Sequence, residues 1–233
     1  MRRLFLLILS SAVWCSTWAN DMHLSVTLKG TFTTNTGFFY DINRTNFVFD
    51  EEKVISSNLG YGADVRWNLM WDRFYLGIGV EKIRSVDHSF AYSSFSDNVR
   101  IPTDEGFSVL MIELSGYYIV PISSDDIQFY MGGGFGLYDG NRLYSIAGVQ
   151  ASTVNSESSM GIHVLTGVEY KISNYIGVRG EIKFRDPHFD VTDKFDQPYT
   201  TFQGVRVPLR QTESVTRINL YGINYMVGMV FQF

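Results

Sequence analysis

Large apolar residues occupy every second position at the C-terminal end of the chain. From Tyr221 to Phe233 every odd-numbered residue is apolar, and the positions between them include the small or polar residues Gly222, Asn224 and Gln232. Alternation with a period of two places the two sets on opposite faces of a β-strand. The pattern predicts a strand over residues 218–233 with one face that is apolar to the last residue of the chain.

The same alternation occurs in seven earlier segments of the chain. They span residues 22–32, 58–69, 74–81, 110–120, 127–137, 160–171 and 176–185. A strand of about ten residues is long enough for a tilted crossing of the hydrocarbon layer of a membrane. With the C-terminal segment, the pattern predicts eight such strands.

The links between these segments alternate between short and long. The links after the second, fourth and sixth segments are a few residues long and rich in turn-forming residues. The other links are predicted as long loops over residues 34–57, 84–105, 139–158 and 186–212. In an antiparallel barrel, this order places all long loops on one rim and all short turns, with both chain ends, on the other. We therefore predict an all-β fold, an eight-stranded antiparallel up-and-down transmembrane β-barrel.

Charged residues within the predicted strands all fall on the face that also carries most of the glycines. A soluble ligand-binding barrel would turn this face to water, whereas a membrane barrel turns it to the lumen. A lysine or arginine facing lipid at the bilayer midplane would cost about 2–4 kcal/mol, which favours the membrane barrel. Six basic and five acidic residues are expected in the lumen as a paired network that fills it: Lys29, Asp64, Arg66, Glu81, Glu113, Glu169, Lys171, Arg179, Glu181, Lys183 and Arg185.

The N-terminus has the pattern of a secretory signal peptide. Arg2 and Arg3 precede an apolar run over residues 4–13, which small residues follow up to Ala19. The run is far shorter than the roughly 20 residues of a helical membrane span. We predict a signal peptide over residues 1–19 and a single barrel domain over residues 20–233.

The single cysteine and the net charge of the chain limit which partners are expected. Cys15 is the only cysteine, and Trp14 before it does not suit the site of lipid attachment in a lipoprotein. The chain has a formal net charge of −5 and loses two arginines with the signal, so the remaining chain is more acidic. An acidic protein is a poor partner for nucleic acid, and none is expected.

The C-terminal pattern and the eight-strand layout resemble the small outer-membrane barrel families of the OmpA transmembrane domain, OmpX and OmpW. The resemblance implies a monomer in the bacterial outer membrane, surrounded by outer-membrane lipid. It also implies that the terminal residues Tyr225, Phe231 and Phe233 form a signal for the outer-membrane assembly machinery.

These families imply two different roles. The OmpX and OmpA types have polar interiors and act as structural or surface-contact proteins, whose loops bind extracellular or host ligands. The OmpW type has a more apolar lumen and is associated with the passage of small hydrophobic molecules. The inward face mixes both characters, so both roles stay open. For passage, Val109 and Met111 would line an apolar entrance near the long-loop rim.

Residue types of an enzyme are present, but not in a catalytic pattern. Asp87, His88 and Ser89 are adjacent in sequence, and adjacent residues seldom converge on one reacting atom. His23 and Ser25 share a strand face near the short-turn end, where polar lumen filling explains them equally well. An outer-membrane enzyme acting on lipid or peptide is the alternative, but no catalytic residue is expected. With four scattered histidines and no cysteine after the signal, no metal or cofactor is expected either.

Overall fold

The computed structural model describes residues 24–40, 53–68, 73–93, 96–124 and 126–233. The predicted signal peptide and His23 lie outside these residues. No helix among the described residues could cross a membrane as a helical span.

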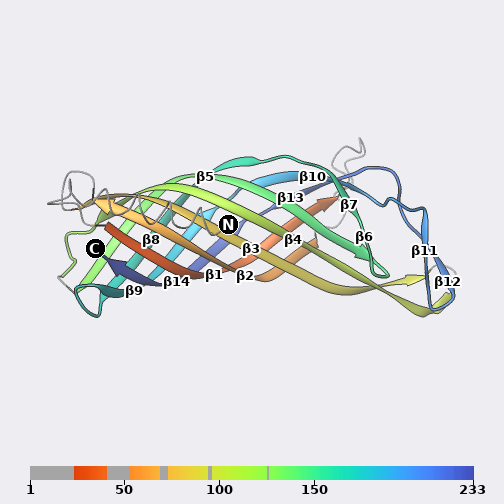
Figure 1. The fold of residues 1–233 in the computed structure, drawn as a ribbon, viewed down its shortest axis with the longest axis horizontal. Helices are drawn as coiled ribbons and strands as arrows, with labels where there is room; N and C mark the ends of the chain where they lie inside the picture. Colours follow the sequence, from red (N-terminus) through yellow and green to blue (C-terminus); the bar gives the residue numbers. More distant parts are fainter. Residues whose placement is uncertain (1–23, 41–52, 69–72, 94–95, 125) are drawn as a thin grey trace, which may run out of the picture.

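Eight antiparallel strands form a closed barrel (Figure 1). Each strand pairs with the next along the chain, and β1 pairs with β14 from Ser25–Gln232 to Thr33–Asn224, which closes the ring. The prediction of an eight-stranded up-and-down barrel is confirmed. The strands of the ring are β1 (Leu24–Tyr40), β2 (Lys53–Asn68), β3 (Phe74–Ser93), β4 (Ser96–Ile119), β5 (Ile127–Ile146), β8 (Ser159–Lys171), β9 (Ile176–Arg185) and β14 (Gly222–Gln232).

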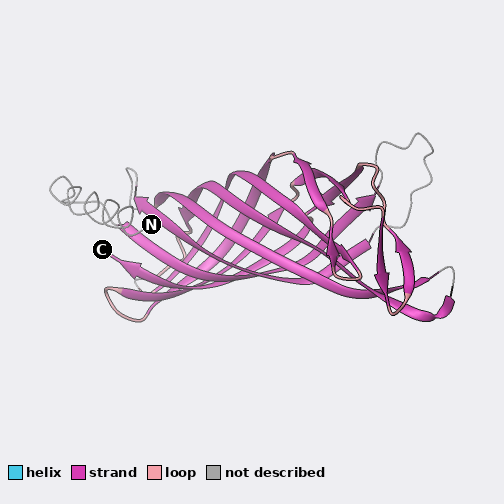
Figure 2. Cartoon of the chain, turned by 45° about the vertical axis from the view of Figure 1, so that its right-hand side comes forward, coloured by secondary structure: helices cyan, strands magenta, loops and turns pink. Residues whose placement is uncertain are grey.

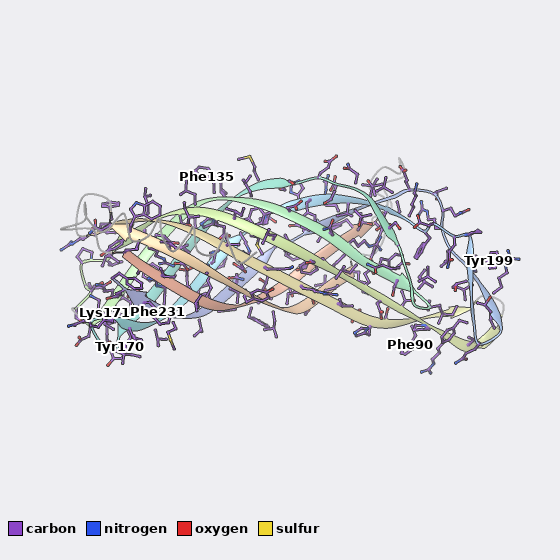
Figure 3. The ribbon with its side chains drawn as sticks, viewed as in Figure 1. Phe90, Phe135, Tyr170, Lys171, Tyr199 and Phe231 are labelled. Atoms are coloured by element: carbon purple, nitrogen blue, oxygen red, sulfur yellow. The ribbon has the colours of Figure 1, made fainter. Side chains whose placement is uncertain are left out.

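The outer wall of the barrel is apolar and exposed. Val227 and Ile162, for example, are 66% and 70% exposed, and Phe135 and Tyr170 point away from the barrel in Figure 3. A soluble protein rarely exposes so extensive an apolar surface. The wall therefore faces lipid, and the alternative of a soluble ligand-binding barrel is wrong.

The predicted long loops are largely β-structure. β3 and β4 remain paired from Phe74–Tyr118 to Phe90–Pro102, which spans most of residues 84–105. Shorter strands occupy the predicted loops over residues 139–158 and 186–212, and one more follows before the C-terminal strand (Figure 2). They are β6 (Val149–Gln150), β7 (Ser152–Ser156), β10 (His188–Lys194), β11 (Tyr199–Phe202), β12 (Val205–Pro208) and β13 (Ser214–Asn219). We call this extension beyond the lipid-facing wall the crown.

The loop prediction was wrong because it relied on the alternation imposed by lipid. Outside the membrane, both faces of a strand accept polar residues, so the signal fades although the strands continue. β13 pairs with β1 and with β10, and β10 pairs with β7, so these strands extend the barrel wall. β11 and β12 form a separate two-stranded hairpin.

The opposite rim carries short turns, as predicted. In the turn before β9, the Ser173 hydroxyl accepts the backbone N–H of Ile176 at 3.2 Å. β1 begins and β14 ends at this rim, where Leu24 and Phe233 exchange backbone hydrogen bonds. The strands therefore run from a tight rim to the crown and enclose a narrow lumen.

Candidate functional site

Inward-facing side chains fill the lumen in successive layers. On β9 the inward positions are Arg179, Glu181, Lys183 and Arg185, which are all buried and run from the tight rim toward the crown. A period of two along each strand brings these residues to one face, and the ring turns that face inward. Ten of the eleven charges expected in the lumen are buried there, and the eleventh, Lys171, is half-buried at the tight rim.

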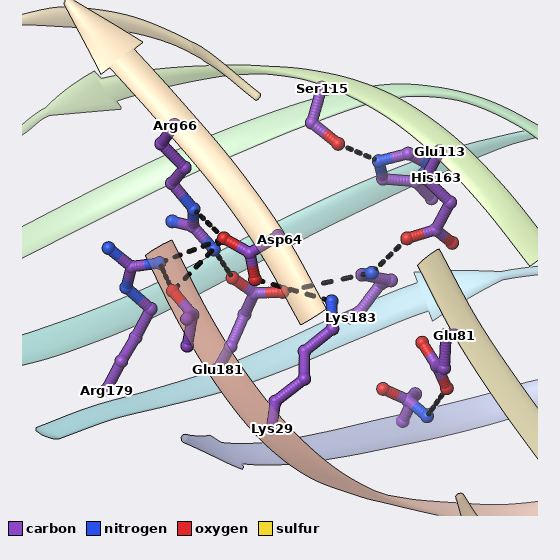
Figure 4. A network of polar contacts seen from close by, with 12 residues as sticks. Lys29, Asp64, Arg66, Glu81, Glu113, Ser115, His163, Arg179, Glu181 and Lys183 are labelled. Atoms are coloured by element: carbon purple, nitrogen blue, oxygen red, sulfur yellow. Dashed lines mark hydrogen bonds and ion pairs between the residues drawn. The ribbon is translucent and has the colours of Figure 1, made fainter. Parts of the chain in front are cut away.

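The lower ion-pair layer is centred on Asp64, which contacts three cations. Its carboxylate accepts from Arg66 Nε at 2.9 Å and from Arg179 Nη1 at 3.1 Å, and Lys29 Nζ lies at 3.5 Å (Figure 4). Arg179 also binds Glu169 at 2.6 Å. These residues come from β1, β2, β8 and β9, so the layer ties distant strands together.

Aromatic side chains support the lower layer. The Arg66 guanidinium lies 3.8 Å from the centre of the Tyr117 ring and donates to Glu181 at 2.8 Å. The Tyr130 hydroxyl donates to the same Glu181 carboxylate at 3.0 Å. Charge-assisted and cation–π contacts are strongest where water is excluded, so Arg66 is held firmly in place.

The middle ion-pair layer joins β3, β4 and β9. Arg185 donates to both carboxylate oxygens of Glu81, at 3.0 and 3.2 Å, and lies 3.4 Å from Glu113. Lys183 forms an ion pair with Glu113. Asn224 on β14 also donates to Glu81, at 3.4 Å. Each carboxylate in this layer therefore has a cationic partner.

His163 and Ser115 form a buried pair beside the middle layer. His163 Nε2 and Ser115 Oγ are 2.8 Å apart (Figure 4). His163 Nδ1 has no hydrogen-bond partner in the described chain, so no carboxylate orients the ring as in a catalytic triad. The pair fills the lumen beside the charges.

An apolar layer lies above the charges. It contains eleven mutually packed buried side chains, namely Phe38, Ile55, Ile83, Phe107, Val109, Met111, Tyr138, Phe189, Val191, Ile218 and Leu220. Val109 and Met111, expected at an entrance near the rim, are both 0% exposed. Their predicted place at the rim was wrong because β4 continues from them to Ser96, well into the crown.

A second polar group, the crown cluster, lies above the apolar layer. It consists of Tyr40, Glu105, Arg142, Tyr144 and Asp193. Arg142 pairs with Glu105 and, at 2.8 Å, with Asp193, and its guanidinium lies 4.3 Å from the Tyr144 ring centre. Tyr40 donates to Glu105 at 2.6 Å.

Burial governs the electrostatics of the crown cluster. Burial raises the pKa of the Asp193 carboxyl, although the Arg142 guanidinium beside it acts in the opposite direction. The sequence prediction missed this cluster because its members lie in segments that were predicted as loops. Alternation of Ile83 with Arg84 and of Phe107 with Ser108 was the signal that could have extended β3 and β4.

The tight rim contains a small hollow. Its volume is about 240 Å³, and its lining includes Lys171, Arg66, Arg179, Glu169 and Phe233. Lys171 thus lies at the mouth of the lumen below the ion-pair layers. Of the terminal aromatics, Tyr225 is exposed on the outer wall with its ring 6.4 Å from Phe32, Phe231 is half-buried, and Phe233 is 75% exposed.

The adjacent residues Asp87, His88 and Ser89 do not converge on one point. His88 Nδ1 lies 2.7 Å from Asp104, whereas the neighbouring Ser89 donates to the Thr103 carbonyl at 3.1 Å. Successive residues of a strand point to opposite faces, so Asp87, His88 and Ser89 cannot meet at one atom. The described residues contain no group of three His, Cys, Asp or Glu side chains that could hold a metal ion.

Comparisons with solved structures identify the fold. The outer membrane protein OprG from Pseudomonas aeruginosa superposes with a TM-score of 0.57 at 12% identity, over 91% of this chain and 95% of that one. Neisserial surface protein A gives 0.47 at 12% identity, over 90% and 97%. The attachment invasion locus protein Ail of Yersinia pestis gives 0.46 at 10%, over 91% and 98%. No protein-family model matches the sequence, and no curated protein is significantly similar to it.

The chain thus has the fold of the small outer-membrane β-barrels, as its sequence pattern predicts. The fold and the lipid-facing wall together place it in the outer membrane of a Gram-negative cell as an integral protein.

Proposed function

We propose that the protein is a non-catalytic outer-membrane barrel with a closed lumen, which serves envelope structure and surface contact through its crown. The observation that carries the proposal is the filling of the lumen: two ion-pair layers, an apolar layer and the crown cluster follow one another along it. An eight-stranded barrel is only wide enough for side chains to fill, so such layers leave little room for a solute.

The crown is the part available for contact outside the cell. It extends the wall with β10 and β13 and carries the β11–β12 hairpin. A hollow of about 370 Å³ lies there, lined partly by Tyr144, Phe195 and Arg210. We propose an extracellular ligand for this surface, with outer-membrane lipid and the assembly machinery as the other partners of a monomeric barrel.

Purified protein in planar bilayers should show no steady ion conductance. The ion pairs that fill the lumen would have to separate before ions could pass, and each separation leaves buried charges unpaired. Single-channel recording tests this, with a large open porin as the positive control. If most inserted molecules form stable channels, the lumen is open. The structural role would then no longer be the preferred function.

A second candidate function is the sideways passage of a small apolar solute. The ladder between β8 and β9 ends at His163–Arg185. Above it, residues 159–162 pair with β5, and no described strand pairs with them on the other side. Pro187, which has no N–H to donate, lies there: a Cβ added to Gly161 would be 3.3 Å from its Cβ. This interruption of the wall borders the apolar layer at Phe189.

Uptake into liposomes separates the two candidates. If the protein allows sideways passage, an apolar probe enters protein-bearing liposomes faster than empty ones, while a sugar of similar size does not. Equal rates for both probes in both kinds of liposome would leave the surface-contact role alone.

Labelling of engineered cysteines tests the orientation of the barrel. Cys15 leaves with the predicted signal peptide, and the chain has no other thiol. Gln197→Cys in the crown should therefore react fully with an impermeant reagent on intact cells. Asn174→Cys, exposed in the turn before β9, is the matched control and should react only after the cells are broken. Labelling of Asn174→Cys but not of Gln197→Cys would invert the orientation.

A further inference from the structure

Two cations stand on the outer wall directly above the lipid-facing band. The outward positions of β3 are apolar from Phe74 to Val80 and are then Lys82 and Arg84, which are both exposed. Strands rise about 3.3 Å per residue and tilt by about 40°, so these residues stand roughly 20–26 Å above Phe74. The apolar band of outer-membrane barrels is about 25 Å tall, so the two cations mark its upper boundary.

Neither cation has a partner in the described part of the chain. Lys82 lies across from Tyr61 on β2 and from Leu110 on β4, and Arg84 lies across from Ser108. None of these neighbours is acidic. The lumen cations Arg66, Arg179, Lys183 and Arg185, by contrast, all form ion pairs. Lys82 and Arg84 therefore present uncompensated charge at the edge of the lipid.

We propose that Lys82 and Arg84 bind the phosphate of an anionic lipid headgroup at the crown end of the band. The site is continuous with the lipid-facing wall, where Ile78, Val80 and Leu110 would contact the acyl chains of the same molecule. Lysine and arginine stems lie along apolar surface while their charged ends remain at the boundary, and arginine suits phosphate geometry. A lipid uses both the apolar and the cationic parts of this surface, whereas a free phosphate uses only the second.

The inference rests on the location of the barrel in the membrane. Its test uses the full chain in micelles of a neutral glucoside detergent. Diphosphoryl lipid A is titrated in, and bound lipid is counted by native mass spectrometry. The variant Lys82→Gln with Arg84→Gln should bind lipid A at least about tenfold more weakly, because each lysine or arginine near a charged lipid surface adds separately to the binding free energy. The exchange Lys82→Arg with Arg84→Lys keeps both charges and should retain binding.

The matched control removes the same charge at the tight rim, at the opposite end of the barrel. Arg73→Gln with Lys171→Gln, at the tight rim, should leave the affinity within about twofold, because those residues lie at the other end of the band. Equal loss in the control, unchanged affinity in the Lys82/Arg84 variant, or equal binding of lipid A without phosphates would overturn the proposal. Complete competition by inorganic pyrophosphate would also overturn it, because the site would then take a free anion. Detergent fractionation of cells tests independently whether the protein lies in the membrane, so that error can be told apart from a wrong lipid site.

Discussion

Replacing Arg185 with alanine is expected to lower the free energy of unfolding by about 3–5 kcal/mol. Arg185 makes a two-point contact with Glu81, which is 1% exposed. Without the guanidinium, the one hydrogen bond left to Glu81 among the described residues is the 3.4 Å contact from Asn224, a neutral donor. The large cost comes from the buried, unpaired carboxylate that remains, more than from the lost contact itself. Urea titration of the refolded barrel, followed by heat-modifiable gel mobility, measures the change.

Two further variants show whether the unpaired charge is the cause. Arg206→Ala removes an exposed cation that lies 3.7 Å from the Tyr199 ring centre in the crown hairpin, and it should lower stability by no more than about 1 kcal/mol. Glu81→Gln combined with Arg185→Met removes both charges and should recover much of the loss. If Arg185→Ala unfolds at the same urea concentration as the parent chain, water reaches the middle layer and the closed lumen is incorrect.

The sequence allowed the inward charges to be predicted but not their partners. Lipid on one side of each strand forbids charge there, so alternation alone assigns Glu81 or Arg185 to the inner face. The ion pairs, however, cross the lumen between distant strands: Arg66 and Glu181 are 115 residues apart, and Arg185 and Glu81 are 104 apart. Which carboxylate meets which cation depends on strand tilt and stagger, which a period of two does not encode.

The strands of the crown could not be predicted from the alternation. Outside the membrane the alternation is no longer enforced, so the strands that carry Glu105, Arg142 and Asp193 gave no lipid signal. Because the predicted strand began at residue 110, Val109 and Met111 were predicted to lie at a rim. Their real surroundings are the apolar layer, and this changes what a substitution there should do.

Met111→Asp is expected to abolish or severely reduce folding, with a loss above about 3 kcal/mol. Met111 is 0% exposed and pairs in register with Glu81 on β3 and with Tyr138 on β5, while Glu113 lies two residues along the same strand. A new carboxylate would therefore be buried, without a free cation, beside two existing carboxylates.

Met111→Leu is the matched control, since it keeps the volume and apolar character of the site and should cost less than about 1.5 kcal/mol. The two variants are compared by the fraction of chain that reaches the heat-modifiable, folded form in the outer membrane. Equal folding of both would mean that water already enters the apolar layer. That layer would then be a permeable chamber next to the interrupted wall at Pro187, and sideways passage of a small solute would replace surface contact as the preferred function.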